Sequence, residues 1–149
     1  MNIVALDDQD RLFLSPAIDD WQEIEERGIT VIIDLDGALD LGVSSLPDHL
    51  LYIYFPIYDE ALPNLEKLHA IARLAAHLVE GGHRVLSHCC MGFNRSALVA
   101  GLILNYLGMS GPDAVSLLRS RRPGALFNEV FAEYLLSLTN GGGRAHTAS

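Results

Sequence analysis

Short apolar stretches that favour β-strands alternate with helix-forming segments along most of this 149-residue chain. The expected strands span residues 11–14, 30–35, 50–56 and 84–88, and the expected helices span residues 20–27, 64–80, 95–107, 112–120 and 129–138. Such an alternation is typical of α/β folds, in which helices cover a parallel sheet. We therefore predict one three-layer α/β domain over residues 1–139, with a central, mostly parallel sheet flanked by helices.

Local signals place the ends of several of these elements. We expect Asp19 to cap the helix at residues 20–27, and Gly81 and Gly82 to end the helix at residues 64–80. The uncharged run at residues 96–112 is short of membrane-spanning length and contains three glycines and Asn105, so we predict a buried core helix there. The glycine-containing residues 140–149 are expected to form a flexible tail.

Charge and cysteine usage exclude several classes of protein. The chain carries 10 basic against 19 acidic residues, a net charge of −9, and so lacks the basic stripe that nucleic acids or acidic membranes require. Its first ten residues include three aspartates instead of the basic and apolar segments of a secretory signal. Cys89 and Cys90 are neighbours and cannot cross-link distant segments. These features favour a cytoplasmic protein that binds neither nucleic acid nor membrane. The sequence does not indicate an oligomeric state.

The loop between the last expected strand and the apolar helix carries the strongest chemical signal. It places Cys89 five residues before Arg95, so backbone N–H groups and the helix N-terminus can surround an anion such as phosphate. The same positive field stabilises Cys89 as a thiolate nucleophile, and the fork of Arg95 can grip two phosphoryl oxygens. Ser96 can donate to the departing sulfur. The residues expected to bind the phosphate are Cys90, Met91, Gly92, Phe93, Asn94 and Arg95.

The loop resembles that of the Cys-x5-Arg protein phosphatases, and within them the small dual-specificity phosphatases, which are similar to protein tyrosine phosphatases. His88 and Cys89, with Gly92, Arg95 and Ser96, fit the family pattern, and residues 121–131 resemble its helical C-terminal segment. The resemblance covers about residues 11–138 and implies a dual-specificity phosphatase-like fold with a phosphocysteine intermediate on Cys89. It requires neither a metal nor another cofactor.

The family mechanism also needs an acid on a loop upstream of the cysteine. Asp59 follows the third expected strand between two prolines, and we predict that it acts as general acid and base, with Glu60 as the alternative. His88 is expected to shape the loop and tune the thiolate rather than to act as a base. We expect Cys90 to pack behind the loop, because neighbouring cysteines seldom reach disulfide geometry without strain.

Two other functions remain open at this point. The chain could be a phosphate-binding module that is weakly active or inactive. The sequence from Asp34 to Gly37 also resembles the start of the magnesium-dependent haloacid dehalogenase phosphatases, with Asp34 as nucleophile, although the expected downstream acidic pair is absent. Otherwise Asp34 and Asp36 end a strand at the rim of the pocket. Arg121 and Arg122 are expected at a solvated helix end or at a second anion site.

The loop itself limits the substrate. Residues 90–94 contain no lysine or arginine, which disfavours polyanionic inositol lipids and RNA 5′ ends. We expect a phosphorylated protein or a small phosphate monoester to bind, with phosphotyrosine as the first candidate and phosphoserine or phosphothreonine as further ones. Tyr58 and Phe93 are expected at the edge of the pocket.

Overall fold

The computed structural model describes residues 1–139, and its centre is a five-stranded sheet in the order β1-β2-β5-β3-β4. The strands are β1 (Val4–Ala5), β2 (Leu12–Ser15), β3 (Val31–Asp34), β4 (Leu51–Tyr54) and β5 (Val85–His88). The ladders β2–β5, β5–β3 and β3–β4 are parallel, and β1 pairs antiparallel with the outer edge of β2. The predicted α/β domain with a mostly parallel sheet is therefore confirmed.

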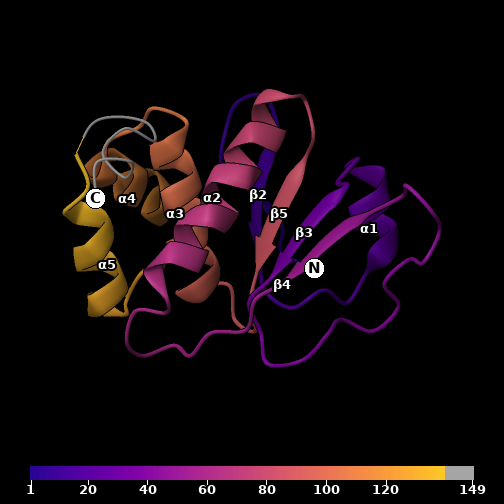
Figure 1. Cartoon of the computed structure of the whole chain (residues 1–149), viewed down its shortest axis with the longest axis horizontal. Helices are drawn as coiled ribbons and strands as arrows, with labels where there is room; N and C mark the ends of the chain where they lie inside the picture. Colours follow the sequence, from indigo (N-terminus) through magenta and orange to yellow (C-terminus); the bar gives the residue numbers. More distant parts are fainter. Residues whose placement is uncertain (140–149) are drawn as a thin grey trace.

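Within residues 1–139, five helices cover the two faces of this sheet. They are α1 (Trp21–Glu26), α2 (Leu65–Glu80), α3 (Arg95–Tyr106), α4 (Gly111–Arg121) and α5 (Glu129–Leu136). Figure 1 shows α2 to α5 together on one side of the sheet and α1 on the other. The three layers follow from this arrangement, and the predicted tail at residues 140–149 lies outside the described residues.

The strand residues alternate between the two faces, as the two-residue period of a strand requires. On β3, Val31 and Ile33 join the larger core under α2 to α5, whereas Ile32 joins the smaller core under α1. Because both faces are covered, all four residues of this strand are buried. The uncharged helix α3 is buried along ten of its twelve residues, which confirms that it is a core helix.

Two local predictions need correction. Asp20, not Asp19, caps α1: its carboxylate accepts hydrogen bonds from the backbone N–H groups of Gln22 and Glu23 at 3.1 and 3.3 Å. Both residues can act as caps, and the chain enters the helix one residue later than expected. Strand β1 was not predicted, because two residues are too few to show an alternating pattern.

Candidate active site

The loop Cys89–Asn94 joins β5, near the middle of the sheet, to the N-terminus of α3. It lies at the carboxyl end of the parallel strands, where α/β folds bind ligands. Gly92 adopts a φ of +74°, and a Cβ there would lie 2.8 Å from the backbone nitrogen of Pro16. The backbone N–H of Ala17 also donates to the Cys90 carbonyl at 3.2 Å. The residues that follow β2 therefore pack against the loop and limit the backbone conformations that the loop can adopt.

Cys89 is buried beneath this loop with two polar groups directed at its sulfur. The backbone nitrogen of Gly92 and the hydroxyl oxygen of Ser96 each lie 3.3 Å from Sγ. The thiol is only 2% exposed, and it is not in a disulfide. A thiolate at this position would accept hydrogen bonds from both groups, so the predicted contact between Ser96 and Cys89 is present.

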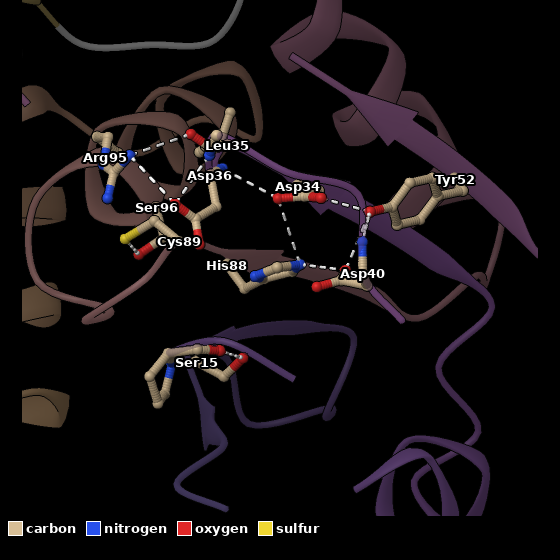
Figure 2. Close-up of polar contacts among 12 residues, drawn as sticks. Ser15, Asp34, Leu35, Asp36, Asp40, Tyr52, His88, Cys89, Arg95 and Ser96 are labelled. Carbon is tan, nitrogen blue, oxygen red and sulfur yellow. Dashed lines mark hydrogen bonds and ion pairs between the residues drawn. The ribbon is translucent and has the colours of Figure 1, made fainter. Parts of the chain in front are cut away.

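Arg95 is the first residue of α3, and Figure 2 shows its side chain beside Leu35 and Asp36, which follow β3. Its Nη1 lies 3.3 Å from the Ile57 carbonyl oxygen, 3.5 Å from that of Leu35, and 3.6 Å from Asp36 Oδ1. Its Nε is buried and has no hydrogen-bond partner among the described residues. A buried donor is costly to leave unpaired, so this atom marks a place prepared for an acceptor oxygen.

Asp59 lies close to Arg95 across a shared hollow, which we call the Arg95 pocket. This pocket has a volume of about 570 Å³ and is lined by Asp36, Gly37, Pro56, Ile57, Tyr58, Asp59 and Arg95. Tyr58 is 82% exposed at its edge, as expected from the sequence. Glu60 is exposed and does not line this pocket. The geometry therefore favours Asp59 over Glu60 as the acid.

Two amide side chains hold the carboxylate of Asp59 in place. Nδ2 of Asn94 donates to Oδ2, and Nδ2 of Asn128 donates to Oδ1, both at 2.8 Å. Asn94 also accepts a hydrogen bond from the backbone N–H of Asn128 at 2.9 Å, and its side chain is 2% exposed. We call this arrangement the Asn94–Asn128 clamp. The side chain of Asn94 thus contacts the acid loop, and the expected binding of phosphate by this part of the loop stays a prediction.

A second polar cluster lies behind the loop and contains His88, Asp34, Asp40 and Tyr52 (Figure 2). His88 Nε2 donates to Asp40 Oδ2 at 2.7 Å, and the Tyr52 hydroxyl donates to Asp34 Oδ2. Burial raises the pKa of Asp34, although hydrogen bonds from Tyr52 and from the Asp36 backbone partly oppose this effect. Burial and then Asp34 raise the pKa of Tyr52. The contact with Asp40 fixes the orientation of the His88 ring, and the influence of His88 on the loop and the thiolate stays a prediction.

The same cluster bears on the alternative of a magnesium-dependent enzyme with Asp34 as nucleophile. Within residues 1–139, Asp34, Asp40 and His88 form a group with spacing that a metal ion could bridge. Both oxygens of Asp34 and Oδ2 of Asp40, however, already accept hydrogen bonds from the Asp36 backbone, from Tyr52 and from His88. Asp34 is 0% exposed and so does not stand at the rim of the pocket, whereas Asp36 does. A buried, fully bonded Asp34 is poorly placed to attack a substrate.

One further prediction about a side chain near the loop was wrong, and another was confirmed in part. Cys90 is exposed and does not pack behind the loop, because its position in the turn directs it outward. Arg121 is exposed in the last turn of α4, as expected for a solvated helix end, and the half-buried Arg122 follows as the C-cap residue. Arg121 donates to the Ala5 carbonyl at 2.8 Å, and Arg122 donates to the Met91 carbonyl at 2.8 Å while its guanidinium lies 4.2 Å from the Phe93 ring centroid.

Sequence reasoning overlooked Asn128, Asp40 and Tyr52 as members of the site. Asn128 was recognised only as part of a C-terminal segment, yet it both caps α5 and donates to Asp59. Its position before a helix was the available signal. Asp40 and Tyr52 offered no local signal. Asp40 reaches His88 from a loop, and Tyr52 on β4 reaches Asp34 and Asp40.

Comparison with known proteins gives a consistent result. The model of the dual specificity phosphatase catalytic domain matches residues 12–140. Human DUSP28 is 22% identical, with a TM-score of 0.76 over 89% of this chain and 92% of that chain. Tk-PTP in its active form is 28% identical, with a TM-score of 0.70 over the same shares of the two chains. The human tyrosine phosphatase-like serine/threonine/tyrosine-interacting protein is 22% identical, with a TM-score of 0.71 and the same coverage.

A search of the curated proteins found no significant match. Among the described residues, no helix is both long and apolar enough to span a membrane.

Proposed function

The chain belongs to the dual-specificity phosphatase family and is a cysteine-based protein phosphatase, and from this premise we propose that it hydrolyses phosphate monoesters through a phosphocysteine on Cys89. The observation that carries this proposal is the buried, unpartnered Nε of Arg95 beside the Cys89 loop. A phosphoryl oxygen would supply the missing acceptor, and the backbone N–H groups of the loop would hold the other oxygens.

In the first step, the thiolate of Cys89 attacks phosphorus and the bond from phosphorus to the leaving oxygen breaks. Asp59 gives its proton to that oxygen, so the alcohol leaves as a neutral molecule. The Asn94–Asn128 clamp supports this role because it holds the carboxylate at the Arg95 pocket. Arg95 supports the transfer by neutralising charge on the phosphoryl oxygens.

In the second step, the Asp59 carboxylate takes a proton from water while the water oxygen attacks phosphorus. The sulfur–phosphorus bond breaks, inorganic phosphate forms, and Cys89 leaves as a thiolate. The Ser96 hydroxyl and the Gly92 N–H, each 3.3 Å from Sγ, support this step by donating to the departing sulfur. Apart from the substrate and water, every group that takes part in these two steps belongs to the chain.

The proposed substrate is phosphotyrosine in proteins, with phosphoserine and phosphothreonine as further substrates. The pocket is open, and Tyr58 at its edge offers an exposed ring against which an aromatic substrate can pack. The two cysteines are free thiols, which supports function in a reducing compartment such as the cytoplasm.

The proposal is tested with p-nitrophenyl phosphate in the presence and absence of EDTA. We expect activity in the wild type with or without EDTA, no activity in Cys89→Ser, a large loss in Asp59→Asn and retained activity in Asp34→Asn. Full activity of Cys89→Ser would refute the thiolate mechanism. Loss of activity both in EDTA and in Asp34→Asn would favour the magnesium enzyme instead. Tight binding of a phosphotyrosine peptide without turnover would identify a binding module.

A further inference from the structure

The carboxylate of Asp36 lies beside the guanidinium of Arg95, the group proposed to bind the phosphate. Its Oδ1 lies 3.6 Å from Arg95 Nη1 (Figure 2), and both residues line the Arg95 pocket. The backbone N–H of Gly37 donates to the same oxygen at 2.8 Å, and the backbone N–H of Asp36 donates to Asp34 Oδ1 at 2.9 Å. Because these bonds come from the backbone, the carboxylate stays at the pocket when Arg95 turns to a ligand.

The charges around the pocket are unbalanced. Of the described residues that line it, Arg95 is the one cation, whereas Asp36 and Asp59 are both acidic. Arg122, the nearby arginine at the loop, already donates to the carbonyls of Met91 and Gly92 and lies over the Phe93 ring. Glu60, next to Asp59, is exposed and adds another negative charge to the same loop. A bound phosphate would pair with the guanidinium of Arg95, and the carboxylate of Asp36 would then lose its cationic partner.

We propose that Asp36 makes this site select phosphorylated residues flanked by lysine or arginine, and reject acidic or multiply phosphorylated segments. This inference rests on the proposed function, since the phosphorylated residue must occupy the Arg95 pocket. A cationic side chain next to the phosphorylated residue replaces Arg95 as the partner of Asp36. The exposed ring of Tyr58 offers the same cation a second contact through its face. An acidic flank would instead meet Asp36 and Glu60 as like charges.

The substitution Asp36→Asn tests this role with little structural change. The asparagine oxygen can still accept from the Gly37 N–H, and the backbone bond to Asp34 remains. Asp48→Asn is the matched control, because it lies in the same β3–β4 loop and removes the same charge. Asp48 lines a different hollow, together with Thr30 and Val31 at the opposite end of β3.

The experiment compares phosphotyrosine peptides of equal length with basic, uncharged or acidic flanks. For the wild type we expect kcat/KM to fall in that order, and for Asp36→Asn we expect the ratio of basic to acidic peptide to fall about two- to fivefold, as for one exposed ion pair. Inhibition by inorganic phosphate should strengthen by a similar factor, since Asp36 no longer competes for Arg95. Salt should reduce the preference of the wild type.

The proposal is overturned if the wild type prefers acidic flanks, or if Asp36→Asn changes the ratio no more than Asp48→Asn does. Dissociation constants of the same peptides with Cys89→Ser separate this result from a failure of the proposed function. Preference for basic peptides in binding, with no turnover of p-nitrophenyl phosphate by the wild type, would support the inference and refute the catalytic proposal. Turnover of p-nitrophenyl phosphate with no preference between basic and acidic peptides would refute the inference and support the catalytic proposal.

Discussion

Replacing Asn94 with alanine removes one of the two amides that hold the carboxylate of Asp59. The side chain lies at the N-terminus of α3 but makes no capping bond to that helix. Its two hydrogen bonds go to Asp59 and to the backbone N–H of Asn128 instead. The variant therefore tests whether the Asn94–Asn128 clamp positions the acid, without removing the nucleophile, the arginine or the acid itself.

The size of the effect follows from the bond that is lost. A hydrogen bond to a charged group contributes about 1.5–3 kcal/mol. If all of this energy positions Asp59 in the transition state, kcat falls about 10- to 150-fold, since about 1.4 kcal/mol corresponds to a factor of ten. The loss cannot exceed that of Asp59→Asn, for which general acid catalysis predicts about 10²- to 10⁴-fold. Unfolding should also become easier by about 1–3 kcal/mol, because the Asn128 N–H loses its partner.

The assay compares two leaving groups. Phenyl phosphate releases a more basic oxygen than p-nitrophenyl phosphate and depends more on a proton from Asp59. We expect Asn94→Ala to slow phenyl phosphate more strongly than p-nitrophenyl phosphate. Ser110→Ala, which removes the cap of α4 far from the pocket, controls for stability alone, with an expected cost of about 1 kcal/mol and unchanged kinetics. Equal slowing of both substrates by Asn94→Ala would refute the positioning role.

Three further predictions concern groups around the sulfur and behind it. Because burial raises the pKa of Asp34 above its usual 3.8, the unfolded carboxyl ionises first, and stability should fall as pH rises from 3.8 through the raised value. Asp34→Asn should remove that fall, and parallel curves of denaturation midpoint against pH for the two proteins would contradict it. Gly92→Ala should lower both Tm and kcat/KM, since alanine at φ +74° costs about 1–2 kcal/mol and its Cβ would clash with Pro16. Unchanged values of Tm and kcat/KM would show that the loop can relax. Ser96→Ala should slow release of Cys89 about tenfold or more and produce a burst of p-nitrophenol, and a linear time course at wild-type rate would exclude this role.

The sequence predicts the fold and the phosphate loop well because their signals are local. Strand and helix periods are visible within a few residues, and the spacing from Cys89 to Arg95 is set by one loop. The order of the strands and the edge strand β1 are not visible in this way. They depend on packing between segments that are distant in the chain.

The parts of the site that sequence reasoning missed are those built by long-range side-chain contacts. Asn94 reaches Asp59 across 35 positions and Asn128 reaches it across 69, so no spacing within a motif reveals the clamp. Asp40 joins His88 across 48 positions in the same manner. The sequence identifies Arg122 as a basic residue, but only the structure reveals that its guanidinium donates hydrogen bonds to carbonyl groups of the loop.

A phosphoryl group bound to Cys89 during turnover is the most direct sign of the proposed chemistry. The Ser96→Ala protein, mixed with excess p-nitrophenyl phosphate and quenched in denaturant, can be digested and mapped by mass spectrometry. We predict phosphate on the peptide that contains Cys89, and none on that peptide in Cys89→Ser. Turnover with phosphate on Asp34, or with no phosphate on any residue of the chain, would contradict the mechanism.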